Sequence, residues 1–246
     1  MKVLSIDIET APNLAYVWSL WDQNVGLNQL VDTSEVLCFA ARFVGQRRMH
    51  FHSTHADGKQ AMIEAAWALL DEADVVMTYN GQSFDVPHLN REFLLAGLGP
   101  PSPFQQIDLY RVVRSRFKFA SNKLAHVSVA LGLDGKADTG GFDLWRRCMA
   151  GDPKAWRIME RYNRRDVVVL EELYEHLRPW VPSHPSVTLH DGTEGCPSCG
   201  AGMAVLVKRG TRKTRVSSFQ RYQCGACGSY SHSGKRVGSV DLRPAA

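Results

Sequence analysis

The stretch Lys2–Thr10 constrains the fold of this chain more than any other. It begins as an apolar strand and ends with two carboxylates, Asp7 and Glu9. Because side chains alternate across a strand, these acids share one face while Ile6 and Ile8 occupy the other. Two neighbouring acids repel each other and resist desolvation unless a cation lies between them. The stretch predicts either a buried strand that ends at a divalent-metal site or a strand end where both acids face water.

The length and composition of the chain are typical of a soluble globular protein. A chain of 246 residues can hold one good-sized domain and a small module, and 44% of its residues are apolar. No apolar run approaches the ~20 residues of a membrane-spanning helix, and no signal-peptide core precedes Asp7. We therefore expect a cytoplasmic protein with no membrane partner.

Positive charge is concentrated near the C-terminus. From Val187 onward there are nine Lys or Arg and three acids, a net charge of +6, so the rest of the chain carries −2 of the total of +4. This split favours a C-terminal piece that binds a polyanion. The alternative is a solvated loop that keeps a small domain soluble.

Hydrophobic periodicity predicts a mixed sheet flanked by helices, which is an α/β fold. After the first strand we expect a hairpin about Gly45–Gln46 and two more short strands. A loop through Gly140 and Gly141 precedes the last helix, whose Pro153 suits a first helical position. The expected strands span residues 36–44, 49–53, 75–77 and 105–107, and the expected helices span 58–72, 84–96, 108–117, 123–131 and 153–177.

Two groups of ring side chains leave alternatives open. Tyr16, Trp18 and Trp21 belong to an irregular stretch over residues 11–30. They form a hydrophobic flap over the sheet or stack on a nucleic-acid base. His50 and His52 have no accompanying acid or cysteine, which favours a solvated edge strand over a metal site.

Two further stretches place acids where predicted elements begin or pack. Asn80–Asp85 follows a strand and a turn, so Asp85 is either a helix-capping acid or part of a site at the strand ends. Tyr162 and Asp166 are four residues apart and lie on one face of the last helix. A carboxylate on that inward face is costly unless it is paired or bound to metal. Asp108 also follows a strand, and we expect a structural role for it.

Taken in this order, these motifs resemble those of the DEDD superfamily of 3′→5′ exonucleases, which includes polymerase proofreading domains and oligoribonucleases. Asp7–Thr10 matches the first motif and Asn80–Asp85 the second. Tyr162 with Asp166 matches the third motif of the tyrosine subclass, since the histidine subclass would have a His where Arg161 stands. The resemblance covers residues 1–180, and stand-alone phage members look most similar, above all around residues 18–26 and 144–174.

The resemblance implies a ribonuclease H-like fold and hydrolysis with two Mg²⁺ or Mn²⁺ ions ~3.5–4 Å apart. Asp7 would bridge the two ions. Glu9 and Asp166 would complete the site that generates hydroxide, and Asp85 would hold the second ion through water. Tyr162 would orient the attacking water.

The same resemblance implies a nucleic-acid substrate. Thr10 and Asn80 would contact the terminal nucleotide. Single-stranded DNA degraded to 5′-mononucleotides is the first choice, and RNA is the second because nothing visibly reads a 2′-hydroxyl. Replication or repair proteins are candidate partners. The alternatives are a non-catalytic nucleic-acid-binding or scaffold protein and a resolvase-like endonuclease; the four acids and the Tyr162–Asp166 spacing favour the exonuclease.

Two CxxC motifs near the C-terminus predict a zinc ribbon. They are Cys196-Pro-Ser-Cys199 and Cys224-Gly-Ala-Cys227, separated by 24 residues. Four thiolates at this spacing make a closed tetrahedral site for one structural Zn²⁺, although the gap is slightly longer than usual. Two disulfides are disfavoured in a reducing cytosol, and an iron site is the other alternative. Metal binding would drive the folding of so small a piece.

The ribbon is expected to assist nucleic-acid binding. Strands are predicted over residues 203–208 and 217–223, and the loop between them is rich in phosphate-binding side chains. These side chains are Lys208, Arg209, Arg212, Lys213 and Arg215. The expected domains are a nuclease domain over 1–181, a linker over 182–193, a zinc ribbon over 194–235 and a basic tail over 236–246. A ribbon that docks a protein is the alternative.

Overall fold

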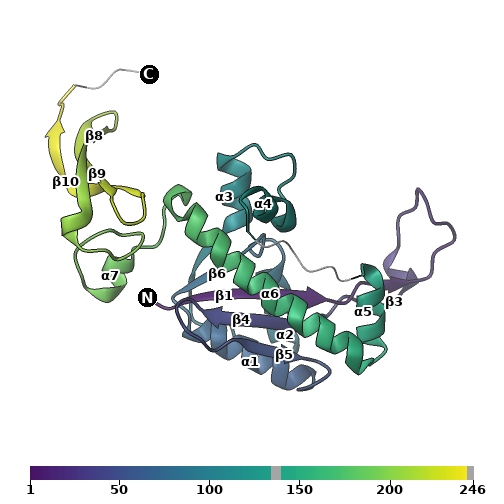
Figure 1. The fold of residues 1–246 in the computed structure, drawn as a ribbon. Coiled ribbons are helices and arrows are strands. Elements are labelled where there is room, and N and C mark those ends of the chain that lie inside the picture. Colours follow the sequence, from purple (N-terminus) through teal and green to yellow (C-terminus); the bar gives the residue numbers. More distant parts are fainter. Residues whose placement is uncertain (134–139, 243–246) are drawn as a thin grey trace. The chain divides into compact units, whose positions relative to one another are not determined.

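The computed structural model describes residues 1–133 and 140–242 (Figure 1). The chain forms two compact units. One unit comprises Lys2–Leu173, and the other comprises the residues from Tyr174 onward together with Met1.

The first unit is built on a five-stranded mixed sheet with the strand order β5-β4-β1-β6-β7. Its central strand β1 is antiparallel to β4 and parallel to β6, and β6 is parallel to β7 (Figure 1). The predicted hairpin is formed by β4 and β5, which leaves β5 at the sheet edge. The strands are β1 (Val3–Thr10), β4 (Val36–Phe43), β5 (His50–Ser53), β6 (Val75–Thr78) and β7 (Gln105–Asp108).

Helices cover both faces of this sheet because its central strands are apolar on both sides. Ile6 and Ile8 belong to a buried core with residues of α1 (Lys59–Glu72) and α2 (Asp85–Leu95). The opposite face belongs to a second core with residues of α6 (Pro153–Leu177), among them Met159. The remaining predicted helices are α3 (Leu109–Arg116), α4 (Leu124–Ala130) and α6 (Pro153–Leu177).

One helix of this unit was not expected. The segment after Gly141, predicted to be a loop, forms α5 (Phe142–Met149). Leu144 and Cys148 are four residues apart and both are buried in the core beside α6. The two glycines directly before it, Gly140 and Gly141, indicated a loop, and the helix begins without a side-chain cap.

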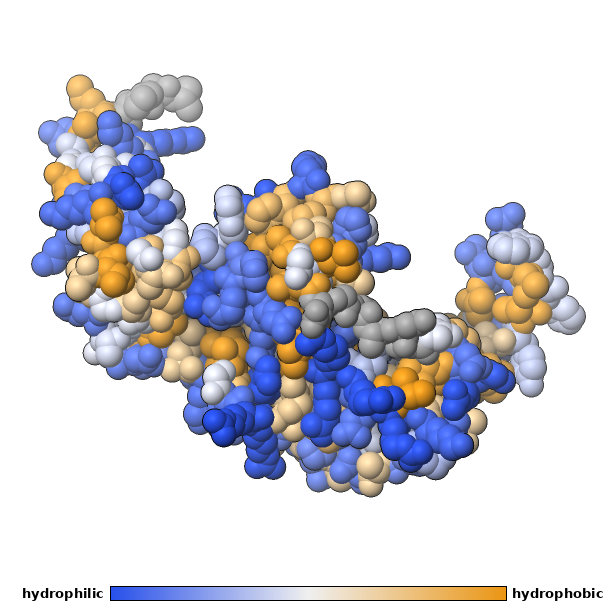
Figure 2. Space-filling model, viewed as in Figure 1, coloured by the Kyte–Doolittle hydropathy of each residue, from blue (hydrophilic) through white to orange (hydrophobic). Residues whose placement is uncertain are grey.

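The aromatic stretch near the N-terminus forms an arm rather than a cover for the sheet. The arm holds the short strands β2 (Leu14–Ala15) and β3 (Leu30–Asp32) and the 3₁₀ turn η1 (Leu27–Gln29). Trp18 is 98% exposed and Trp21 is 80% exposed, so the hydrophobic-flap alternative is wrong. Apolar side chains of the arm lie on the surface in Figure 2.

The second unit contains a three-stranded antiparallel sheet with the order β10-β9-β8. The stretch 208–215 is therefore mostly strand and not loop, and the turn that follows is closed by the Thr214 amide donating to the Ser217 carbonyl, 2.8 Å. Strand β10 takes Arg236 from the predicted tail into the sheet. The strand predicted over residues 217–223 is confirmed, whereas the unpredicted β10 is rich in polar residues and no apolar alternation marks it. The elements are η2 (Arg178–Trp180), α7 (Val187–Asp191), η3 (Met203–Val205), β8 (Leu206–Lys213), β9 (Ser217–Cys224) and β10 (Tyr230–Ser239).

Across the described parts of the chain, none of the helices has both the length and the apolar character needed to cross a bilayer.

Candidate active site and metal centres

Three of the predicted acids come together between β1 and α6. The carboxylate oxygens of Asp7, Glu9 and Asp166 lie within 4.8 Å of one another. Asp166 is buried, and the other two are half-buried. Three like charges this close are strongly unfavourable without a cation, and an all-oxygen ligand set suits Mg²⁺ or Mn²⁺. These residues, called the acidic cluster below, fit a divalent-metal site.

The register of β1 explains how it presents two acids on one face. Asp7 lies opposite Ala40 and Glu9 opposite Cys38. Residues directly opposite in a ladder share a face, so small neighbours leave room beside both carboxylates. Burial raises the pKa of the Cys38 thiol, and the nearby carboxylates raise it further. Cys38 thus stays neutral and acts as a packing residue.

Asn163 is a site residue that the sequence analysis missed. Its side-chain amide Nδ2 donates to the Asp7 carboxylate Oδ2 at 2.7 Å and to the Asp7 carbonyl at 3.1 Å. Asn163 is fully buried, and its Oδ1 has no hydrogen-bond partner among the described residues. Asn163 precedes Asp166 by three residues, which is the spacing of neighbours on one helix face and the only sequence signal for its role. It fixes the orientation of one acid of the cluster.

Asp85 lies beside the acidic cluster without belonging to it. Its Oδ1 accepts a hydrogen bond from the Ile8 amide at 3.2 Å, and Ile8 is the residue between the two acids of β1. The parallel pairing of β1 with β6 ends at Ser5 and Met77, so Asp85 satisfies an amide beyond the ladder. Burial raises the pKa of Asp85 to about 7, although the Ile8 amide opposes the shift. A cation nearby would favour its ionised form.

A tight turn after β6 sets the start of α2. Asn80 adopts a left-handed backbone with φ 69°, and a Cβ on Gly81 would lie 2.4 Å from the Thr78 Cβ. The Asp108 carboxylate accepts from the amides of Asn80 (2.8 Å) and Gln82 (3.3 Å). It also accepts from two amides at the start of α3. The structural role predicted for Asp108 is confirmed.

Tyr162 lies one turn before Asp166 on α6, and both side chains are buried. Its ring meets Trp145 edge-on, with the ring centroids 6.1 Å apart and the planes at 73°. Trp145 comes from α5, the helix that the sequence did not reveal. That helix therefore helps to hold the tyrosine in place.

Thr10 ends β1 at an irregularity in the ladder with β4, where its partner shifts to Val36. A pocket of about 770 Å³ begins at the next residue, Ala11. Its lining includes Trp156, which stacks on His55 with ring centroids 5.4 Å apart and planes at 7°. The pocket is large enough for a nucleoside and has an aromatic wall.

Asn80 lines a different hollow, of about 680 Å³. Arg111 and Arg114 of α3 also line it. The Arg111 guanidinium donates to the Gln82 side chain, which holds it near the turn after β6. This hollow suits an anion such as a backbone phosphate.

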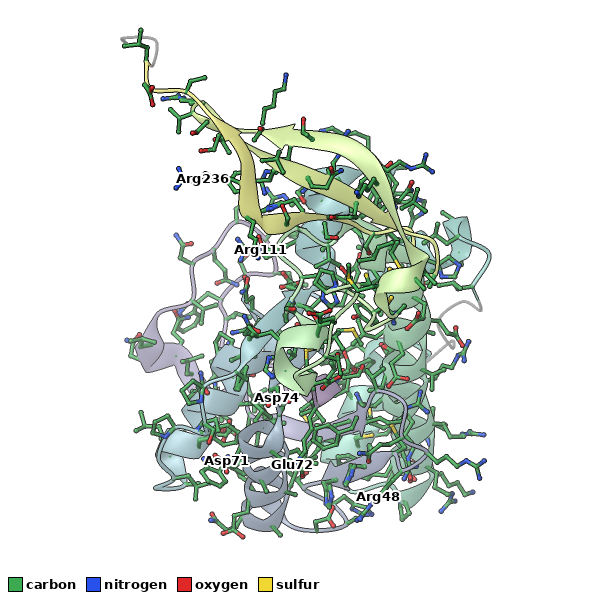
Figure 3. All side chains as sticks on the ribbon, turned by 90° about the vertical axis from the view of Figure 1, so that its left-hand side faces the viewer. Arg48, Asp71, Glu72, Asp74, Arg111 and Arg236 are labelled. Carbon is green, nitrogen blue, oxygen red and sulfur yellow. The ribbon has the colours of Figure 1, made fainter. Side chains whose placement is uncertain are left out.

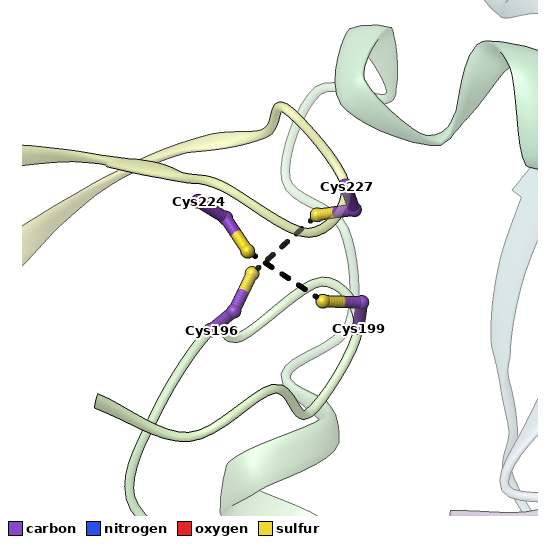
Figure 4. Close-up of side chains that lie close together, drawn as sticks. All are labelled: Cys196, Cys199, Cys224 and Cys227. Atoms are coloured by element: carbon purple, nitrogen blue, oxygen red, sulfur yellow. Dashed lines mark hydrogen bonds between the residues drawn. The ribbon is translucent and has the colours of Figure 1, made fainter. Parts of the chain in front are cut away.

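The four cysteines of the second unit converge as predicted (Figure 4). The Cys196 and Cys227 sulfurs are 3.7 Å apart, and the Cys199 and Cys224 sulfurs are 3.8 Å apart. Zinc–sulfur bonds of about 2.3 Å in a tetrahedron give sulfur–sulfur edges of about 3.8 Å. Disulfides would need about 2.05 Å. The donor set and its spacing therefore fit a tetrahedral Zn²⁺ site.

The basic residues predicted to bind phosphate do not form one group. Arg215 lies in the turn between β8 and β9, and the other four lie on β8. All five are exposed. The four on β8 occur on both faces of the ribbon sheet.

A family profile described as the RNase H superfamily matches residues 6–178. The chain belongs to the RNase H superfamily. Its α/β fold, a mixed sheet flanked by helices with a small cysteine-bearing C-terminal module, is the one predicted. No curated protein matched the chain.

Among solved structures, the chain is similar to the family B DNA polymerase from the hyperthermophilic archaeon Pyrobaculum calidifontis. The TM-score is 0.54 at 20% sequence identity, and the match covers 72% of this chain and 24% of the polymerase. The chain thus spans about a quarter of that polymerase's length. The likeness supports the RNase H-like fold.

Proposed function

We propose that this protein is a metal-dependent 3′→5′ exonuclease that releases 5′-mononucleotides from single-stranded DNA, with RNA as the second substrate to test. The observation that carries the proposal is the acidic cluster, in which three carboxylates from β1 and α6 lie within 4.8 Å of one another. The nuclease-like fold and the order of the sequence motifs support the same reaction class. Magnesium or manganese is the cofactor that this oxygen-only ligand set favours.

In the proposed reaction, a water oxygen attacks the terminal phosphorus and the bond to the 3′-oxygen breaks. A proton passes to that oxygen, leaving a 5′-mononucleotide and a strand one residue shorter. Two bound ions would supply an activated water and stabilise the leaving oxygen. Asp7, Glu9 and Asp166 would hold them, with Asp85 contributing through water. The Tyr162 hydroxyl would orient the attacking water.

The surroundings of the cluster offer places for the substrate. Thr10 and the pocket that begins at Ala11 would receive the terminal nucleoside. Asn80, with Arg111 and Arg114, would contact a phosphate. The zinc ribbon, with its excess of Lys and Arg, would assist strand binding. Replication or repair proteins are the proposed cellular partners.

The test uses end-labelled single- and double-stranded DNA and RNA with Mg²⁺ or Mn²⁺. A 5′-labelled strand should shorten one nucleotide at a time, and a 3′ label should appear as a mononucleotide from the first turnover. Asp166→Asn should lower the rate by about a hundredfold or more, because it weakens the metal site. Glu171→Gln, on the same helix, removes a carboxylate that pairs with Arg42 and should keep the activity.

Two results would overturn the proposal. Internal cuts that leave both labels on oligonucleotides would identify an endonuclease. Binding without cleavage under all metal conditions, in protein whose thermal unfolding is normal, would identify a non-catalytic nucleic-acid-binding protein.

A further inference from the structure

The strand register of the zinc ribbon sorts its side chains onto two faces. Arg212 lies opposite Phe219, and His232 lies opposite Arg221. Directly opposite residues share a face, as do alternate residues along a strand. Gln223 of the same face receives a hydrogen bond from Arg209 at 3.1 Å. The set, called the arginine face below, comprises Arg209, Arg212, Phe219, Arg221, Tyr230, His232 and Arg236.

A bulge in β8 brings two of these arginines together. Lys208 pairs with Tyr222 and Thr211 pairs with Gln220, so β8 holds one residue more than β9 over this span. Gly210 supplies the left-handed backbone of the bulge, with φ 71°. In a regular strand, Arg209 and Arg212 would point to opposite faces because they are three residues apart. The bulge places both on the arginine face.

On this face, guanidinium groups alternate with rings. The Arg221 Cζ lies 5.8 Å from the centre of the Tyr230 ring. The rings of Phe219 and His232 are 5.5 Å apart, and the Arg212 guanidinium contacts the His232 ring nitrogen. Such contacts preorganise both the charges and the flat surfaces.

The charges of the face are not neutralised within the ribbon. Arg221 donates to the carbonyl oxygen of Arg209 at 2.9 Å, and Arg209 donates to a glutamine amide, so these partners are neutral. No Asp or Glu occurs between Gly195 and Val240 in the sequence. Arg236, on β10 (Figure 3), adds a further exposed positive charge. The face therefore suits an anionic ligand with flat groups.

The opposite face provides a contrast within the same sheet. It carries Lys208 and Lys213, opposite Tyr222 and Ser218. A lysine ammonium is a compact, strongly hydrated charge, and it lacks the planar group that stacks on a ring or a base. Both faces are positive, but the interleaving of arginine and aromatic groups belongs to the arginine face.

We propose that the arginine face binds single-stranded nucleic acid, with guanidinium groups on phosphates and bases stacked on Phe219 and Tyr230. A single strand presents both its charges and its unpaired bases, whereas a duplex hides the base faces. This inference deepens the proposed nucleic-acid role of the ribbon and rests on it. It assigns that role to one face and one mode of contact.

The test measures binding of labelled oligo-dT and oligo-rU by anisotropy at increasing salt. The full chain carries Asp166→Asn so that the strand stays intact. Arg212→Gln with Arg221→Gln should reduce the slope of log affinity against log salt by about 1.4, because each single-strand phosphate contact contributes about 0.7. Lys208→Gln with Lys213→Gln removes the same charge from the opposite face and should reduce the slope by less than half as much.

A ring variant separates stacking from charge. Phe219→Leu should weaken binding roughly tenfold with an unchanged salt slope. Zinc content and thermal unfolding establish that each variant is folded. Equal slopes in the two double variants, or an unchanged slope in the arginine-face variant, would overturn the proposal. Hydrolysis of a short chromogenic phosphodiester by chains with Asp166 intact tests the nuclease separately, since that assay needs no strand binding.

Discussion

Removing the Asn163 side chain tests whether the acidic cluster is preorganised for metal. In Asn163→Ala, the Asp7 carboxylate loses a hydrogen bond of 2.7 Å, and its carbonyl loses one of 3.1 Å. A hydrogen bond to a charged group contributes about 1.5–3 kcal/mol. If Asp7 must keep its orientation to hold the ion, most of this energy is lost from metal binding. The expected weakening is about 10- to 150-fold, in line with outer-shell effects at metal sites.

Calorimetric titration of the full chain with Mn²⁺ measures the effect directly. A second comparison completes a double-mutant cycle: the Mn²⁺ affinity of Asp7→Ala is compared with that of the double variant Asp7→Ala plus Asn163→Ala. Because Asn163 acts through Asp7, it should have little further effect on Mn²⁺ affinity once Asp7 is removed. Equal losses in both backgrounds, or Mn²⁺ affinity unchanged by Asn163→Ala alone, would show that Asn163 does not orient Asp7 for metal binding. Thermal unfolding of each variant separates loss of metal from loss of fold.

Three further perturbations have expected outcomes. Burial opposes ionisation of Glu92, but the hydrogen bond from Arg91 and the ion pair with Lys59 lower its pKa. The stability that ionised Glu92 contributes is therefore present above the ordinary carboxyl pKa and is lost as pH falls through the pKa of the folded state. Glu92→Gln should cost roughly 1–3 kcal/mol at pH 7 and flatten the acid limb of stability measured by urea unfolding. Cys224→Ser should release zinc and unfold the ribbon, seen by metal analysis and circular dichroism, while the first unit keeps its unfolding transition. Gly81→Ala places a Cβ 2.4 Å from that of Thr78 and should lower the free energy of unfolding by about 1–3 kcal/mol. In the control Gly99→Ala, the added Cβ meets no atom within 4 Å, and the free energy of unfolding should change by under about 0.5 kcal/mol.

Strong periodicity made much of the first unit predictable. The helix expected over residues 153–177 is α6 (Pro153–Leu177), because its apolar stripe is long and a proline begins it. The strand Val3–Thr10 was likewise marked by its apolar residues and terminal acids. Two elements gave no such signal. The helix α5 follows the glycine pair Gly140–Gly141, which indicated a loop, and β10 is stabilised by pairing with β9 rather than by an apolar face.

The candidate site was predictable in its acids but not in its supports. The strand period places Asp7 and Glu9 on one face of β1, and the helix period places Asp166 on the inward face of α6. The fold then brings the three acids together. Asn163 joins them through a contact between residues 156 positions apart, which no local pattern encodes. Asp85 was placed with the acids by motif order alone, and its bond to the Ile8 amide follows from where β6 stops pairing.

The measurement closest to the central claim is anomalous scattering from crystals of the protein soaked with Mn²⁺ and a mononucleotide. Two anomalous peaks about 3.5–4 Å apart are expected, bounded by the carboxylates of Asp7, Glu9 and Asp166. Asp166→Asn should weaken at least one of these peaks. Manganese peaks elsewhere in the crystal, with none beside these carboxylates, would contradict the two-metal site.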